Sequence, residues 1–215
     1  MNSDTLKQIK NLSIDPKKPL LIFDADEVLV LFAHHFSEFL NKHGWRLNLK
    51  GYRLDDAIEH IQDHYLASNT TYQRLIDEFI DQETAHQPEA PGASATLEKF
   101  KNLAEIIILT NVPARAYSHR IKNLHDLNMR YPTICNAGLK GPALFEIAKL
   151  TKKTCIFIDD NPFQIASAAK YTPDIYRFHF TACEIVKKTM PKAKGATHRP
   201  SSWREVDRLL TQILI

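Results

Sequence analysis

The stretch Leu20–Val30 has the sequence LLIFDADEVLV, and the interpretation of the whole chain starts from it. Its first four residues are apolar and suit a strand that is buried in a parallel sheet. Three acids, Asp24, Asp26 and Glu27, follow within four positions. Carboxylates crowded at a strand end repel one another and lose hydration, so a fold that keeps them there provides a metal ion, a cationic side chain or solvent. Because open α/β sheets bind ligands at the carboxyl ends of their strands, the stretch indicates a chemical site.

The length and composition are those of an ordinary globular protein. The chain has 215 residues, of which 44% are hydrophobic and 25% are charged, and this length allows one substantial core with a smaller second module. A net charge of +3 is too small to indicate a nucleic-acid-binding surface, and the basic residues between 187 and 204 are interpreted as a solvated face. No apolar run could span a bilayer and neither end resembles a targeting signal. We therefore expect a cytoplasmic protein with no nucleic-acid or membrane partner.

The cysteines and histidines do not indicate a disulfide framework or a zinc site. Cys135, Cys155 and Cys183 form no CxxC pair, and a thiol in an apolar strand usually acts as a small core residue. The 10 histidines are scattered without the spacing of zinc ligands. The acids at the strand end therefore remain the main chemical signal.

Strand-like and helix-like segments alternate in most of the chain. A short helix is expected at residues 3–11, before the first strand. Beyond residue 94, strands are predicted at 105–110, 133–135, 154–158 and 175–178, and helices at 95–102, 114–127, 143–150 and 163–170. Ser202 and Glu205 have the spacing of a capping box at the start of a C-terminal helix. This alternation predicts an α/β fold, a Rossmann-like three-layer core with a mainly parallel sheet between helices.

The region after the first strand has a different pattern. Apolar residues have helical spacing at 33–43, 54–66 and 72–80, and no strand signal is present. We predict a small all-helical insert at residues 32–87, which divides the core into residues 1–31 and 88–215. Residues 87–94, with the sequence QPEAPGAS, contain two prolines and a glycine and are interpreted as the return linker.

Polar residues follow three of the predicted strands. They are, in chain order, Asp24 and Asp26, Thr110 and Asn111, and Asp159 and Asp160. In a parallel sheet these positions share one edge, where four carboxylates would require a hard cation, and oxygen ligands suit Mg²⁺. Asn161 before Pro162 has the pattern of a helix cap with a first-turn proline, which would bring helix N-terminal amides to the same edge. Magnesium together with exposed amides favours an anionic substrate.

The order of these motifs resembles the haloacid dehalogenase-like (HAD) superfamily of hydrolases. The matching motifs are Asp24-Ala25-Asp26, Thr110-Asn111, Lys140 within the sequence GLKGP at residues 138–142, and Asp159-Asp160. Each motif alone is weak, but four in order on the expected elements are specific. The resemblance covers most of the chain and implies a Rossmann-like sheet with a mobile C1-type cap, residues 32–87, over a Mg²⁺ site.

The resemblance also implies a catalytic role for each motif. Asp24 would be the nucleophile that forms an aspartyl-phosphate, and Asp26 would protonate the leaving group and then activate water. Lys140 would neutralise charge on Asp24 and on the phosphoryl group, while Thr110 and the backbone of Asn111 would hold phosphoryl oxygens.

The implied metal ligands are the Asp24 carboxylate, the backbone carbonyl of Asp26, and the pair Asp159 and Asp160. The sequence leaves open which member of that pair contacts the metal directly. Glu27 departs from the pattern, because phosphatases of the superfamily usually carry glycine at this position. The added side chain brings bulk and charge into a crowded turn.

We therefore expect a Mg²⁺-dependent phosphatase that acts on a small phosphorylated metabolite. Two alternatives stay open, a catalytically quiet regulatory or interaction protein, suggested by Glu27, and a phosphotransferase or mutase of the same superfamily. Asp26 argues against carbon–halogen cleavage, since the dehalogenases of the superfamily lack this second acid. The oligomeric state and the substrate stay open. Candidate specificity residues in the insert are His34, His35, Arg53, His60, His64, Tyr65, Tyr72 and Arg74.

Overall fold

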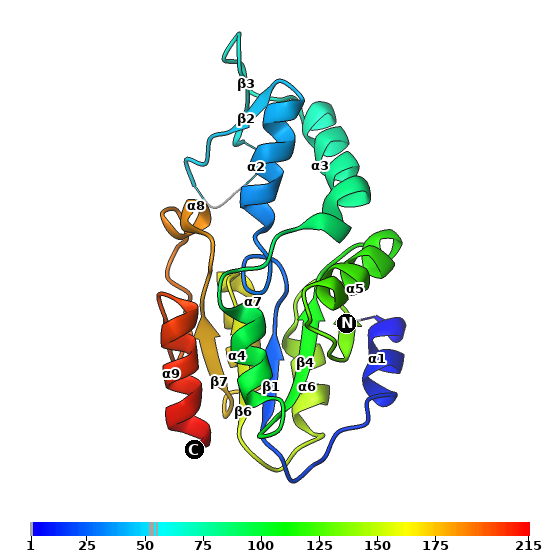
Figure 1. Cartoon of the computed structure of the whole chain (residues 1–215), viewed down its shortest axis with the longest axis vertical. Coiled ribbons are helices and arrows are strands. Elements are labelled where there is room, and N and C mark those ends of the chain that lie inside the picture. Colours follow the sequence, from blue (N-terminus) through cyan, green and yellow to red (C-terminus); the bar gives the residue numbers. More distant parts are fainter. Residues whose placement is uncertain (1, 52–53, 55) are drawn as a thin grey trace.

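The structure of the chain, a computed structural model, describes residues 2–51, 54 and 56–215. Figure 1 shows an α/β part that contains the central sheet and, beyond the carboxyl ends of its strands, the insert of residues 32–87. Among the described residues, no helix is both long and apolar enough to cross a membrane.

Five parallel strands form the central sheet in the order β5-β4-β1-β6-β7. The strand β1 (Leu20–Phe23) is fully buried between β4 and β6. The chain builds β4 and β5 outward on one side of β1 and then crosses to β6 on the other side, so the order reverses between β1 and β6, where such sheets bind ligands. The other strands are β4 (Glu105–Thr110), β5 (Thr133–Cys135), β6 (Cys155–Asp159) and β7 (Tyr176–His179).

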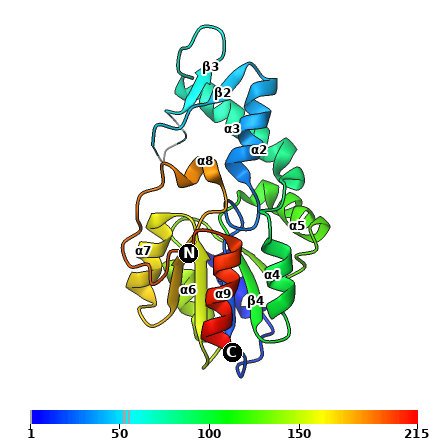
Figure 2. The ribbon, with the colours of Figure 1, turned by 60° about the vertical axis from the view of Figure 1, so that its left-hand side comes forward.

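Helices cover both faces of this sheet, because successive strand residues point to opposite sides. Leu21 and Phe23 pack with α4 (Ala93–Phe100), α5 (Tyr117–Asp126) and α9 (Trp203–Leu214). Leu20 and Ile22 pack with α1 (Ser3–Lys10), α6 (Gly141–Ala148) and α7 (Pro162–Tyr171). Figure 2 shows α9 and α4 on one side of the strands. These three layers confirm the predicted α/β class and its parallel sheet, and Ser202 caps α9 as predicted by accepting a hydrogen bond from Glu205 N.

The insert has a hydrophobic cluster of its own. Phe36, Phe39 and Phe79 form its centre, with ring centroids 4.9 to 6.4 Å apart. The two connections to the sheet run side by side, since Leu31 N donates to Pro88 O at 3.0 Å. That the insert moves as a separate domain stays a prediction. Its elements are α2 (Phe32–Lys42), β2 (Trp45–Leu47), β3 (Ile58–His60), α3 (Asn69–Glu83) and the 3₁₀ turn η1 (Thr84–His86).

The prediction of an all-helical insert is wrong over residues 54–66. There the strand β3 pairs antiparallel with β2, which places Ile58 opposite Leu47. The spacing of Ile58 and Ile61 suggested a helix, but Ile58 is buried in the aromatic cluster and Ile61 is 39% exposed. Strands of three residues are too short for apolar alternation to show in the sequence. Residues 52, 53 and 55 lie outside the described residues.

A short helix, α8 (Glu184–Lys187), packs between the sheet region and the insert and was not predicted. Cys183 and Val186 pack against Ala33 at the start of α2. In Figure 2, α8 lies between the sheet and the insert. Part of the basic segment supports this region, because Lys187 Nζ donates to Ser201 O at 2.7 Å.

Candidate active site

A buried lysine joins the carboxyl ends of β1 and β6. Lys140 Nζ lies 2.6 Å from Asp24 Oδ1 and 2.7 Å from Asp159 Oδ2. The Lys140 side chain is 1% exposed. Burial acts to lower the pKa of Lys140, but Asp159 and Asp24 together outweigh burial and raise the pKa above its ordinary value. Lys140 therefore places a positive charge between two acids.

The loop before α6 places this lysine. Gly138 has the left-handed φ of 79°, and its carbonyl accepts hydrogen bonds from Asn111 Nδ2 at 2.7 Å and from Gln164 Nε2 at 3.2 Å. Gln164 Oε1 in turn accepts from Lys140 N at 2.7 Å. Side chains that follow β4 and β6 thus hold the loop. Gln164 was not singled out in the sequence, where a lone glutamine in a helix carries no signal.

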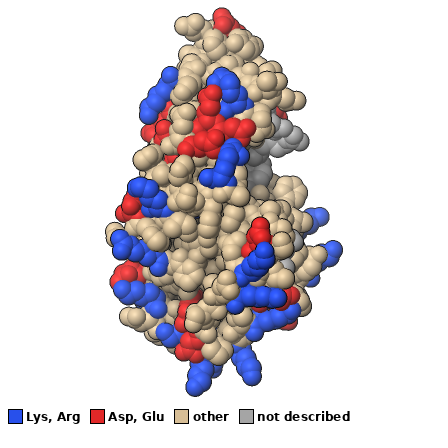
Figure 3. All heavy atoms as spheres, turned by 90° about the vertical axis from the view of Figure 1, so that its right-hand side faces the viewer, with Lys and Arg blue, Asp and Glu red and all other residues tan. Residues whose placement is uncertain are grey.

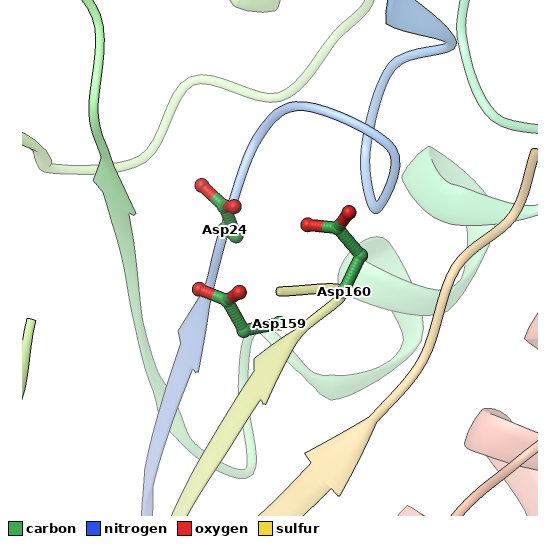
Figure 4. A group of neighbouring side chains, drawn as sticks. All are labelled: Asp24, Asp159 and Asp160. Carbon is green, nitrogen blue, oxygen red and sulfur yellow. The ribbon is translucent and has the colours of Figure 1, made fainter. Parts of the chain in front are cut away.

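Three carboxylates gather at the point where the strand order reverses. Asp24, Asp159 and Asp160 each offer an oxygen, and these oxygens lie within 4.8 Å of one another. Figure 4 shows the three side chains at the ends of β1 and β6. Burial raises the pKa of both Asp159 and Asp160, and the charge of Asp24 adds to this effect. A buried group of three carboxylates fits a hard divalent cation such as Mg²⁺.

The two adjacent acids have different surroundings. Asp159 Oδ2 accepts a hydrogen bond from Lys140, and Asp159 Oδ1 accepts one from Asn161 N at 2.8 Å. Asp160 lines the cavity above the sheet edge. The backbone carbonyl of Asp160 is 2.8 Å from His179 Nε2, which fixes the chain at this point. Asp160 is therefore the member of the pair that is better placed toward a ligand in the cavity.

Asp26 has a cationic partner of its own. Its Oδ1 lies 2.5 Å from Arg120 Nη2 in α5, and the Arg120 side chain is 1% exposed. Burial raises the pKa of Asp26, against the opposing effect of Arg120. Sequence reasoning missed Arg120. A signal was present, because Arg120 stands four residues after Ala116 and four before Leu124, on the buried stripe of the helix.

Thr110 and Asn111 reach the same edge from β4. Thr110 is fully buried, and its Oγ1 has no hydrogen-bond partner among the described residues. The Asn111 side chain donates to Gly138 O and accepts from Asn136 Nδ2 at 2.9 Å. Asn111 therefore supports the lysine loop with its side chain, while the Thr110 hydroxyl is left for another acceptor or donor.

Glu27 occupies a backbone conformation that favours glycine. Its φ is 62°, in the left-handed region, and the residue is 6% exposed. Glu27 Oε1 accepts a hydrogen bond from Ala33 N at 2.6 Å, and its carbonyl accepts one from Ala182 N at 2.7 Å. Burial raises the pKa of Glu27 to about 7. The third acid of the opening stretch therefore supports the start of α2 and the segment that leads to α8.

A cavity of about 500 Å³ lies over these residues. Asp24, Asp26, Lys140 and Asp160 contribute its charged floor. The insert contributes apolar and aromatic groups, which include Phe32 and Tyr72, and Val186 of α8 closes a further side.

Of the candidate specificity residues in the insert, Tyr72 lines this cavity. His35 Nε2 lies 2.7 Å from Glu83 Oε2, and Arg74 pairs with Glu78 on the surface of α3. The remaining described candidates are not among the residues that line the cavity, and Arg53 lies outside the described residues. His34 lies near Glu38, His64 near Glu59, and His60 stacks on Tyr65.

Comparison with known proteins identifies the fold. No family model matches the sequence, and a search of curated proteins finds no match. Solved structures match over nearly the whole chain. L-2-haloacid dehalogenase from Xanthobacter autotrophicus has a TM-score of 0.57 at 11% identity and covers 89% of this chain and 98% of its own. A proposed phosphatase from Clostridium difficile has a TM-score of 0.59 at 15% identity, covering 91% and 100%.

A third match contains magnesium. The proposed HAD hydrolase YfnB from Bacillus subtilis, in a magnesium-bound form, has a TM-score of 0.60 at 11% identity and covers 90% of this chain and 99% of its own. The matches include a dehalogenase as well as hydrolases of other kinds, so the likeness identifies the architecture and not the reaction. The chain has the fold of the haloacid dehalogenase-like hydrolases.

Proposed function

We propose that this protein is a Mg²⁺-dependent phosphomonoesterase that forms a covalent intermediate on Asp24. The observation that carries the proposal is the charge of Lys140 between Asp24 and Asp159, within a group of three buried carboxylates below a cavity. Such a group is unfavourable without further positive charge, and a fold retains it when the charge serves a ligand.

The hydrogen bonds of Asp24 support its proposed role as the nucleophile. Its Oδ1 accepts hydrogen bonds from Ala25 N at 2.7 Å and from Lys140 Nζ, which leaves Oδ2 as the attacking oxygen. A bond forms between Oδ2 and phosphorus as the bond from phosphorus to the ester oxygen breaks. Water then attacks phosphorus, releases phosphate and restores the Asp24 carboxylate.

Asp26 moves the protons for both steps. It lines the cavity and would protonate the departing ester oxygen, then take a proton from the attacking water. The Thr110 hydroxyl, which has no partner among the described residues, would donate to a phosphoryl oxygen. This use of Asp26 separates the proposal from carbon–halogen cleavage, because a halide leaves without a proton.

The donor set would hold Mg²⁺ through Asp24, Asp160 and the backbone carbonyl of Asp26, with Asp159 beside them. When bound, the ion would supply positive charge to the phosphoryl oxygens and to the carboxylates, in addition to that of Lys140. The cavity of about 500 Å³ suits a small phosphorylated metabolite, and its aromatic roof would cover the organic part.

A phosphate-release screen tests this function. Wild type, Asp24→Asn and Asp126→Asn are assayed with Mg²⁺ over sugar phosphates, nucleotides and amino-acid phosphates. Asp126 is a matched acid on the surface of α5, where it pairs with Lys122. We expect turnover by wild type and Asp126→Asn, loss of at least about 10³-fold in Asp24→Asn, and loss on chelation.

The covalent step has its own readout. Acid-quenched wild type should carry one added phosphoryl group by intact-protein mass spectrometry, and Asp24→Asn should not. Transfer of phosphate to an added alcohol in place of water would indicate a phosphotransferase. Absence of turnover across the whole panel would overturn the proposal and favour a catalytically quiet protein.

A further inference from the structure

We propose that Arg120 is a positioning residue that holds the Asp26 carboxyl for proton transfer and, through Asn123, links that carboxyl to the end of the insert. The inference rests on the proposed phosphatase function. It goes beyond that function because it assigns a role to α5, whose residues lie outside the four motifs.

The ion pair fixes one oxygen of Asp26 while leaving the side chain in contact with the cavity. Arg120 Nη2 lies 2.5 Å from Asp26 Oδ1, and the Asp26 side chain is 28% exposed. A guanidinium buried as deeply as that of Arg120 is costly without a partner, and its planar fork restricts the direction of the carboxyl that it binds. The pair therefore limits the directions in which Asp26 can point.

The guanidinium is itself oriented from the other side. Arg120 Nη1 donates to Asn123 Oδ1 at 3.1 Å. Arg120 Nε has no hydrogen-bond partner among the described residues, so the hydrogen bonds that orient the group are those to Asp26 and Asn123. Asn123 is buried one turn after Arg120 on the same helix. These hydrogen bonds form a short network that runs from the cavity into α5.

Asn123 extends this hydrogen-bond network to the insert. Its Nδ2 donates to Gln87 O at 2.8 Å and lies 3.4 Å from Ala85 O, at the end of η1 and the start of the return linker. A shift of these backbone carbonyls would act on Asn123, and through the guanidinium on Asp26. The position of the insert and the direction of Asp26 are therefore coupled by hydrogen bonds.

Arg115 offers a matched comparison. It lies in the turn η2 (Ala114–Ala116) before α5, and its Nε donates to Asp81 Oδ1 at 2.7 Å, with Asp77 as a second partner. These acids belong to α3, and acidic side chains gather on this face of the insert (Figure 3). Arg115 thus contacts the insert from the same part of the core, but its partners are insert acids and not Asp26.

Two esters that differ in their leaving groups test the role of Arg120. Nitrophenolate leaves without a proton, whereas the alkoxide of an alkyl phosphate requires one. The parameter is kcat/KM, which covers the steps up to departure of the leaving group. For Arg120→Gln we expect a loss of about 10- to 100-fold on the alkyl phosphate and less than about threefold on nitrophenyl phosphate. Arg120→Lys, which keeps the charge without the fork, should lie between this variant and wild type.

Further variants separate positioning from stability. Asp26→Asn should lose about as much on the alkyl phosphate as Asp26→Asn combined with Arg120→Gln, because the two residues act as one unit. Asn123→Ala should show the same ester selectivity with a smaller loss, about three- to tenfold. Arg115→Gln should change both esters alike.

The outcomes distinguish this inference from the proposed function. Equal losses on both esters in Arg120→Gln, or losses that multiply in the double variant, would overturn the positioning role. Turnover by wild type would in that case still support the proposed phosphatase function. Equal losses on both esters in Asn123→Ala would overturn the link to the insert. A wild type that is inactive on both esters and on the whole screen would overturn the function and this inference together.

Discussion

Two sites with buried carboxylates in this protein, Glu59 in the insert and the acids at the sheet edge, differ in how their charge is compensated. In the insert, Glu59 of β3 accepts a hydrogen bond from Asn48 Nδ2 at 2.9 Å, pairs with Arg46, and lies 3.0 Å from His64 Nδ1. These hydrogen bonds, with that from Asn48 the largest, lower the pKa of Glu59 to about 2. Glu59 is an acid whose charge is satisfied by its neighbours.

At the sheet edge the balance is reversed. Asp159 and Asp160 are raised in pKa by burial, and Lys140 is the cation that lies between Asp24 and Asp159. Hydrogen-bond donors favour the charged form of Glu59, whereas burial and mutual repulsion oppose the charges of Asp159 and Asp160. A bound cation would stabilise the charges of these sheet-edge acids.

The largest expected effect comes from removing the lysine. Lys140→Met would leave Asp24 and Asp159 buried without their cation, and we expect the free energy of unfolding to fall by about 3 to 5 kcal/mol. Urea unfolding followed by circular dichroism measures this change. Lys149→Met, which removes an exposed lysine just after α6, should change the free energy by less than about 0.5 kcal/mol. Equal effects of the two substitutions would contradict the comparison.

Mg²⁺ should have the next largest effect. Because the ion would bind the sheet-edge acids of the folded protein and not the unfolded chain, binding should raise the free energy of unfolding by about 2.7 kcal/mol at a hundred times the dissociation constant. The shift of the urea midpoint on addition of MgCl₂ measures it. Asp160→Asn should reduce the shift, and Glu59→Gln should leave it unchanged. A wild-type midpoint that does not respond to Mg²⁺ would refute the metal site.

Glu27 is intermediate in kind, because its Oε1 accepts a hydrogen bond from Ala33 N while burial raises its pKa to about 7. Glu27→Ala would lose the hydrogen bond from Ala33 N and keep the left-handed backbone. Glu27→Gly would lose the same hydrogen bond but adopt that backbone without strain, so we expect it to be more stable than Glu27→Ala by about 1 kcal/mol. Urea unfolding of the two variants tests this order, and a more stable alanine variant would show that the positive φ carries no cost.

The sheet-edge residues could be predicted because strand ends determine their place. An apolar run that stops at Asp24, Thr110 or Asp159 predicts both a strand and the polar residue at its carboxyl end. The alternation of strands and helices predicts that the sheet is parallel. Their convergence then follows from topology, without knowledge of any individual contact.

The features that could not be predicted from the sequence depend on contacts between distant segments. Arg120 meets Asp26 across 94 residues of chain, and no local pattern encodes that pairing. The strands β2 and β3 are three residues long, and what makes them strands is their pairing and the burial of Ile58 in the aromatic cluster. Tertiary packing overrides weak local preference in such segments.

The smallest effect distinguishes the two groups by the sign of their pH dependence. Since the folded pKa of Glu59 lies below its ordinary value of 4.5, its contribution to stability is present above about 4.5 and is lost as the pH falls toward about 2. The sheet-edge acids have raised pKa values, so their charges destabilise the fold at neutral pH, and this destabilisation is relieved as the pH falls. The difference in urea midpoint between wild type and Glu59→Gln should therefore be constant above about pH 5 and shrink below about 4.5. If the difference were the same at every pH, Glu59 would contribute to stability through packing and not through its charge. The two sites would then no longer differ in the pH dependence of their contributions.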